Sequence, residues 1–162
     1  GVNAPLSSSA GRLFDAVAAF LGLLDDEMSY EGEAAMRLEA LARRGDAAKG
    51  GYPLGDGPSI ATAPLFRALA KDRAGGARPE DMAARFHAGL AMAFAARARD
   101  AVEQGHAAAV ALSGGCFQNA LLLDLTARAL EGVPLMIHRR MPAGDGGLSL
   151  GQAAVAAARL AG

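Results

Sequence analysis

The sequence predicts an α/β fold with a helix-rich N-terminal half. Apolar residues recur at helical spacing through most of the first 104 residues, whereas two short, mainly apolar runs appear after residue 106. Each run is followed by another helical pattern, so the order is helices first and then strand–helix–strand–helix, which fits an α/β lobe. With 162 residues, 52% of them apolar and 20% charged, we expect one globular domain over residues 1–162.

Three helices are expected before the longest one. Three serines at 7–9 offer cap oxygens to an apolar stripe that runs over residues 13–24. A second helix is expected over residues 34–44 and a third over 64–72. The segment 46–63 between them is dense in glycine and proline, which predicts a long loop or short strands.

The second half contains the longest helix and both strands. The helix is expected over residues 79–104, with a proline at its start and two acidic residues in its first turn. The apolar runs 107–112 and 133–138 predict two strands, and the first is expected to be buried. Helical patterns follow them over 117–131 and 148–160.

Charge and cysteine content exclude several classes of protein. The formal net charge is −1 and the basic residues are spread along the chain, so nucleic acid is not an expected partner. Cys116 is the single cysteine, which excludes an internal disulfide and a multi-cysteine zinc site and favours the cytoplasm. We expect neither a signal peptide nor a membrane-spanning segment from these residues. Because the sequence starts at Gly1, we expect a piece of a longer protein.

The first candidate site is the run Ser113-Gly114-Gly115, which lies between an expected strand and an expected helix. Glycines there let the backbone approach a ligand, and the N-terminus of the helix would present N–H groups to an anion. The run is neither a Walker loop nor the glycine fingerprint of dinucleotide-binding proteins. A tight turn without a ligand explains the same residues, so both interpretations stay open.

Asn119 and Asp145 are two further candidates. Asn119 falls in the first turn of the helix after the glycine loop, where it would reach a ligand or cap the helix. Asp145 lies in a glycine-rich turn over residues 143–147, where its carboxylate would bind a metal ion or a ribose. A plain Asp-Gly turn is the alternative.

Nucleophilic and histidine-based chemistry is less favoured. Cys116 sits at an expected helix N-terminus, but no histidine is near it in sequence, and a lone cysteine commonly packs as a small hydrophobe. Ser113 lacks the Gly-x-Ser-x-Gly elbow of serine hydrolases. His87, His106 and His138 lack the spacing of a metal pair on one helix, so we expect each to be structural or solvated.

Several segments together resemble the HypF family of hydrogenase-maturation carbamoyltransferases. They are SSAGRLFDAV at 8–17, YEGEAA at 30–35, RFH at 85–87, LSGGCFQN at 112–119, and DGG at 145–147 with GQ at 151–152. HypF proteins are similar here to the Kae1/TsaD enzymes, which make threonylcarbamoyladenosine in tRNA and belong to the actin-like ATPase (ASKHA) superfamily. The resemblance implies one lobe of that fold, and it implies that residues 1–162 form the C-terminal portion of a Kae1-like carbamoyltransferase domain.

The resemblance also implies a reaction and its partners. Carbamoyl phosphate and ATP would yield a carbamoyl-adenylate elsewhere in the HypF chain. The Kae1-like domain would pass the carbamoyl group to the C-terminal cysteine of HypE, which dehydrates it towards the cyanide ligand of nickel–iron hydrogenase. HypE and the remainder of the HypF chain are thus the implied partners, and this chain alone is expected to be inactive and to retain no metal tightly.

Site residues follow from the resemblance position by position. Those that would bind the nucleotide are Asp15, Gly32, Ser113, Gly114, Gly115 and Asn119. The first two would meet the ribose or base, and the glycine loop would face the phosphates. Asp145 would be a ligand of a divalent metal ion (Zn, Fe or Mg) whose other ligands lie outside this chain. Glu33 is a weaker candidate, and no catalytic residue is assigned.

Two alternatives remain beside the HypF interpretation. One is a Kae1/TsaD-like tRNA threonylcarbamoyl transferase or an O-carbamoyltransferase, and the other is a non-catalytic module that binds a nucleotide or docks a partner. The Phe-Gln-Asn and Asp-Gly-Gly sequences favour HypF, and the near-neutral charge argues against tRNA.

Overall fold

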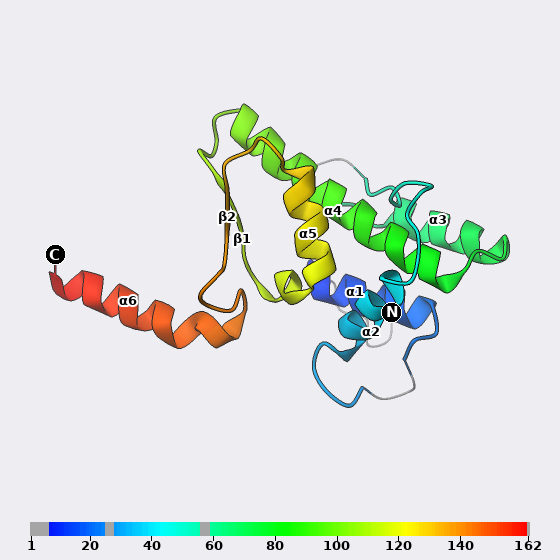
Figure 1. Ribbon diagram of the computed structural model, residues 1–162, viewed down its shortest axis with the longest axis horizontal. Coiled ribbons are helices and arrows are strands. Elements are labelled where there is room, and N and C mark those ends of the chain that lie inside the picture. Colours follow the sequence, from blue (N-terminus) through cyan, green and yellow to red (C-terminus); the bar gives the residue numbers. More distant parts are fainter. Residues whose placement is uncertain (1–6, 25–27, 56–58, 162) are drawn as a thin grey trace. The chain divides into compact units, whose positions relative to one another are not determined.

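The computed structural model describes residues 7–24, 28–55 and 59–161, and the chain divides into two compact units (Figure 1). Unit 1 spans Gly1–Ala93 and unit 2 spans Phe94–Gly162. Gly57 and Pro58, part of the expected loop, lie outside the described residues. The assignment of residues 1–162 to one domain stays a prediction.

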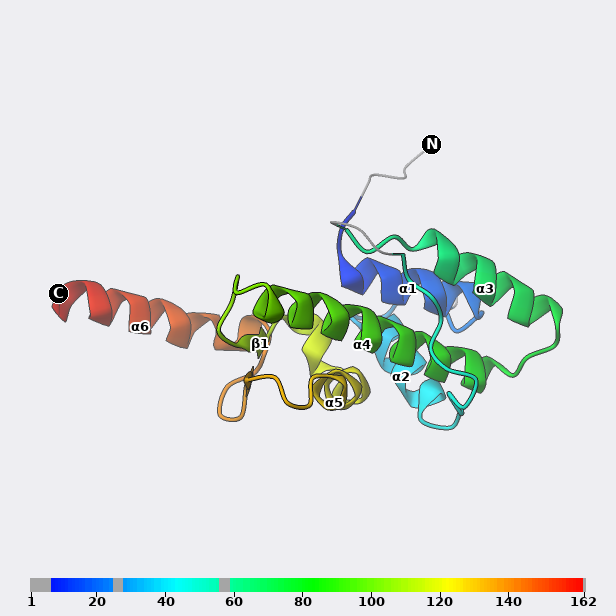
Figure 2. The ribbon, with the colours of Figure 1, turned by 90° about the horizontal axis from the view of Figure 1, so that it is seen from above.

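Unit 1 consists of helices, as the sequence predicts. They are α1 (Ala10–Phe20), α2 (Glu33–Ala42), α3 (Ala63–Ala74) and the first part of α4 (Pro79–Glu103) (Figures 1 and 2). The Ser9 hydroxyl accepts from the backbone N–H of Arg12 at 3.4 Å and caps α1. This helix ends earlier than the apolar stripe because Gly22 adopts a left-handed backbone with φ +73°. In the parts of the chain that are described, no helix is long and apolar enough to cross a membrane.

Aromatic side chains from α1 and α4 form the centre of unit 1. The rings of Phe14 and Phe86 meet edge to face with centroids 5.0 Å apart, and Phe14 also lies 5.4 Å from the ring of His87. All three side chains are buried, together with leucines from α2, α3 and α4. Because His87 lies among these rings, burial lowers the pKa of its imidazole, although a hydrogen bond between Nδ1 and the Ala83 carbonyl acts in the opposite direction.

The glycine- and proline-rich loop is fixed against α4 by a close backbone contact. The N–H of Tyr52 donates to the carbonyl of Arg85 at 3.0 Å, and its hydroxyl donates to Asp72 at 2.6 Å. The Arg85 guanidinium pairs with Asp72 and lies 4.2 Å from the centre of the Tyr52 ring. Burial and the Asp72 carboxylate raise the pKa of Tyr52. A Cβ on Gly89 would lie 2.2 Å from the Tyr52 carbonyl oxygen, so this crossing requires glycine.

Unit 2 is built on a two-stranded parallel sheet. Strand β1 (Val110–Leu112) pairs with β2 (Leu135–Ile137), and α5 (Ala120–Ala129) connects them. The helix α6 (Leu148–Ala161) follows, and each of its residues is exposed. Both strands are shorter than the apolar runs that predict them.

The expectation that the first strand is buried is wrong for one of its two faces. Leu112 is buried and packs with Ala95 and Leu130, but Ala111 on the opposite face is exposed. A continuous apolar run is typical of a strand whose sheet is covered on both faces. The described part of unit 2 covers one face of β1, so the other face is exposed.

The buried imidazole of His87 makes the stability of the protein dependent on pH. Its pKa in the folded protein lies below the ordinary value of about 6.5, so the unfolded chain takes up the proton more readily. The stabilising contribution is therefore complete above that value and decreases as the pH falls through it towards the folded pKa. We expect the free energy of unfolding to fall by up to about 1.4 kcal/mol per pH unit on this account.

Urea denaturation at several pH values between 7.5 and 5 measures this effect. His87→Phe, which keeps a ring among the aromatic side chains, should flatten the pH dependence. His106→Ala, which removes an exposed histidine, should leave it unchanged. An equal pH dependence in the His87→Phe protein would contradict the assignment.

Candidate functional site

Two loops meet where the parallel strands end. Leu112 pairs with Ile137 in the sheet, so the residues that follow them, Ser113 and His138, leave the sheet at the same edge. Ser113 Oγ and His138 Nε2 lie 3.0 Å apart. The carboxyl edge of parallel strands, where these loops lie, is the edge at which open α/β sheets bind ligands.

Backbone hydrogen bonding holds the two loops together. The N–H of Gly114 donates to the carbonyl of Ala143 at 2.7 Å, and the Ser113 hydroxyl lies 3.4 Å from the same oxygen. Gly114 has φ +93° and ψ 164°, a backbone conformation that is essentially restricted to glycine. A Cβ on Gly144 would lie 2.3 Å from the side-chain amide nitrogen of Gln118, so a larger residue there would require the end of that side chain to move.

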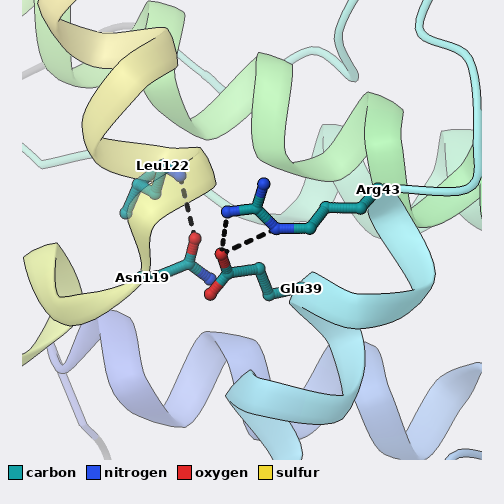
Figure 3. Close-up of polar contacts among 4 residues, drawn as sticks. All are labelled: Glu39, Arg43, Asn119 and Leu122. Atoms are coloured by element: carbon teal, nitrogen blue, oxygen red, sulfur yellow. Dashed lines mark hydrogen bonds and ion pairs between the residues drawn. The ribbon is translucent and has the colours of Figure 1, made fainter.

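The helix expected to start at residue 117 begins later. The glycine loop leads into a short 3-10 turn, η1 (Gly115–Gln118), and α5 starts at Ala120. Asn119 is the N-cap of α5, and its side-chain oxygen accepts from the N–H of Leu122 at 2.8 Å (Figure 3). Asn119 is 8% exposed, and its oxygen serves the capping role that the sequence left as an alternative. Its role in binding a nucleotide stays a prediction.

A ligand at the glycine loop could take its N–H donors from the loop itself and would not need the N-terminus of α5. The N–H groups of Gly115 and Cys116 come before the first hydrogen bond of η1, and neither donates to an acceptor within the described ranges. Cys116 itself is half-buried, and burial raises the pKa of its thiol. A raised pKa disfavours the thiolate, so the structure supports the apolar packing role of Cys116 over the nucleophilic one.

An open groove of about 930 Å³ lies beside the glycine loop. Its lining comes from Ser113 to Gly115, from the segment after β2, and from α6. The polar side chains in this lining are Ser113, His138, Asp145, Gln152 and Arg159. The rest of the lining is mostly small or apolar, so the groove offers a shallow apolar wall with a few polar groups near the strand ends.

Asp145 faces this groove but forms no metal site with the residues described. It opens the short 3-10 turn η2 (Asp145–Gly147), its side chain is exposed, and its carboxylate has no hydrogen bond or ion pair in the described part of unit 2. Over the described ranges, no group of three histidine, cysteine, aspartate or glutamate residues could hold a metal ion. A metal at Asp145 would need ligands from outside these residues, and the role predicted for Asp145 stays a prediction.

Asp15 and Gly32 belong to unit 1, on two helices that contact each other. The Asp15 carboxylate lies 3.1 Å from the Arg12 guanidinium, yet its Oδ2 is enclosed and accepts no hydrogen bond of good geometry from any described residue. Gly32 is the N-cap of α2 and has φ +83°, so the position requires glycine for the backbone alone. Their predicted contacts with a ribose or base stay predictions.

Glu33, the weaker candidate, has a structural role. Its side chain is 5% exposed and pairs with the Arg37 guanidinium at 2.5 Å. It also accepts from the N–H of Ser29 at 2.7 Å, which ties the incoming chain to the first turn of α2. These contacts account for a buried carboxylate without a ligand.

The pair of Ser113 and His138 is the feature that sequence reasoning missed. The sequence predicts His138 to be structural or solvated and gives Ser113 no basic partner. The pairing arises because both residues directly follow strands that are parallel and in register. The sequence predicts each strand but not the register in which the two strands pair. Only that register would have revealed that Ser113 and His138 are neighbours.

Comparison with known proteins identifies the family. Residues 1–152 match the family model described as the second subdomain of a carbamoyltransferase Kae1-like domain. The chain is 56% identical to the carbamoyltransferase HypF of Rhodobacter capsulatus, over 99% of this chain and 21% of that protein. It is 45% identical to the HypF of Rhizobium leguminosarum bv. viciae, over 94% of this chain and 20% of that protein. The chain thus spans about a fifth of the length of these relatives.

Solved HypF structures share the fold. A full-length HypF in the phosphate- and nucleotide-bound form matches 95% of this chain and 25% of its own length, with a TM-score of 0.83 and 32% identity. The HypF of T. kodakarensis matches 99% of this chain and 21% of its own, with a TM-score of 0.84 and 33% identity. The predicted α/β lobe of the Kae1-like type is therefore confirmed. The chain belongs to the HypF carbamoyltransferase family and corresponds to the second subdomain of its Kae1-like domain.

Proposed function

We propose that this chain forms the nucleotide-binding wall of the carbamoyl-transfer site of a HypF enzyme. The observation that carries the proposal is the meeting of the Gly114 loop and the Gly144–Asp145 loop at the carboxyl ends of two parallel strands. A ligand in the adjoining groove would meet backbone N–H groups of the loop 113–115 and the carboxylate of Asp145.

The charge balance around the groove supports an anionic ligand. Residues 132–162 contain three arginines against one aspartate, and Arg159 lines the groove. Arg139 and Arg140 are exposed and form no ion pair with any residue the structure describes. A full-length HypF has been solved in a phosphate- and nucleotide-bound form, which supports a nucleotide as the ligand of this chain too.

The reaction we propose is the transfer of a carbamoyl group from carbamoyl-adenylate, made from carbamoyl phosphate and ATP, to the C-terminal cysteine of HypE. The HypE thiolate attacks the carbamoyl carbon, the bond to the phosphate oxygen breaks, and AMP leaves. This chain would hold the phosphate of the leaving AMP, while the remainder of the HypF chain supplies the opposite wall. The half-buried Cys116 is not the acceptor in this scheme. We place the reaction in the cytoplasm.

Membership of the HypF family favours the HypF reaction over the tRNA-modifying alternative. The non-catalytic alternative makes a different prediction, because a docking module would bind HypE but no nucleotide. Calorimetric titration of a full-length HypF that carries this sequence, with ATP and separately with HypE, distinguishes the two functions.

A substitution at Gly114 tests the phosphate-binding role of the loop. Gly114→Ala forces an alanine into a backbone conformation reserved for glycine, which costs about 1–3 kcal/mol or displaces the loop. We expect ATP to bind about tenfold more weakly to the full-length protein, because the loss of one hydrogen bond to a charged group has about that effect.

Gly132→Ala is the matched control for this change. Gly132 also has a positive φ, of +82°, but it does not line the groove. Both variants should unfold at lower temperature, whereas the Gly114 variant alone should lose affinity for ATP. Equal ATP affinities in the two variants would contradict the role of the loop.

Asp145→Ala tests the proposed metal ligand. In a full-length HypF that retains a divalent ion, we expect the variant to bind that ion at least about tenfold more weakly, as is typical for the loss of groups at a metal site. Asp124→Ala removes another exposed aspartate of unit 2, on α5, and should leave the metal content unchanged. Metal analysis by mass spectrometry gives the readout, and full metal content in the Asp145 variant would exclude the role.

A further inference from the structure

His138 is a polar side chain of the groove to which the reaction above assigns no part. It directly follows β2, and its Nε2 lies 3.0 Å from the hydroxyl oxygen of Ser113 on the neighbouring strand end. Both side chains are exposed, and a hydrogen bond between exposed side chains contributes little to stability. The pair lies in the lining of the groove, next to the glycine loop.

The surroundings of the Ser113 hydroxyl limit where its proton can point. One acceptor within reach is the carbonyl oxygen of Ala143, at 3.4 Å, and that oxygen already accepts from the N–H of Gly114 at 2.7 Å. The other neighbour is His138 Nε2, which either donates to the hydroxyl oxygen or accepts its proton. When Nε2–H donates, the hydroxyl proton is free to turn from a long bond to Ala143 towards an acceptor in the groove.

We propose that His138 is a positioning residue that donates to the Ser113 hydroxyl and directs this hydroxyl as a hydrogen-bond donor to the phosphate of the bound nucleotide. The inference rests on the proposed function, because it takes the nucleotide as the occupant of the groove. His138 then acts through Ser113, and its contribution to binding exists only while the serine hydroxyl is present.

A double-mutant cycle on ATP binding tests this dependence. The protein is a full-length HypF that carries this sequence, and the four forms are unmodified, Ser113→Ala, His138→Ala and both together. We expect each single variant to bind ATP about fivefold to tenfold more weakly, as for the loss of one hydrogen bond. The double variant should bind no more weakly than Ser113→Ala alone. Effects that multiply in the double variant would overturn the inference.

Two further variants separate positioning from a general loss of structure. His138→Gln keeps an amide N–H that can donate to Ser113, and it should recover most of the affinity for ATP. His106→Ala removes an exposed histidine of the same unit that does not line the groove, and it should leave ATP binding unchanged. If His138→Gln binds as weakly as His138→Ala, while both melt at the temperature of the unmodified protein, donation to Ser113 is not the role of His138.

The same titrations distinguish this inference from the proposed function. If the unmodified full-length protein binds no ATP, the proposed function fails and this inference falls with it. If it binds ATP and Gly114→Ala weakens binding, but the effects of Ser113→Ala and His138→Ala multiply, the proposed function stands and the role of His138 is excluded.

Discussion

The hydrogen bond from the Gly114 N–H to the Ala143 carbonyl is the contact on which the groove depends. It joins the loop after β1 to the loop after β2, and these loops are adjacent only because the two strands are parallel and in register. The bond needs glycine at 114, where the backbone is in a region that other residues avoid. This arrangement positions Ser113, His138 and Asp145 at the groove.

Unit 1 rests on a comparable constraint of close backbone approach. The loop around Tyr52 crosses α4 at Gly89, where a single Cβ would strike the Tyr52 carbonyl. The loop is then held by a hydrogen bond from the Tyr52 hydroxyl to Asp72, by the ion pair of Asp72 with Arg85, and by the Arg85 guanidinium over the Tyr52 ring. Gly89 permits the close approach of two backbones in unit 1, and Gly114 provides the backbone N–H that joins the two loops in unit 2.

The sequence predicted the helices well because apolar spacing is a local signal. The longest helix was expected over residues 79–104 and ends one residue earlier, at Glu103. The start of α5 was misplaced because Gly115 and the residues after it favour a 3-10 turn, which shifts the cap to Asn119. Strand lengths were overestimated because pairing with a neighbour, and not apolar content, decides where a strand ends.

The candidate site was predictable only in part, for the same reason. The glycine loop and Asp145 are local motifs, and the structure brings both to one groove. The partnership of Ser113 with His138 depends on strand register, which no local pattern shows. Asp15 and Gly32 were predicted from the family resemblance alone. The left-handed backbone at the N-cap of α2 is sufficient to explain the glycine at position 32.

The most direct measurement is the structure of a full-length HypF that carries this sequence, bound to a non-hydrolysable ATP analogue. The account predicts a phosphate oxygen within about 3 Å of a backbone nitrogen of the loop 113–115. Phosphates bound elsewhere, with this loop empty and beyond hydrogen-bond reach, would contradict it.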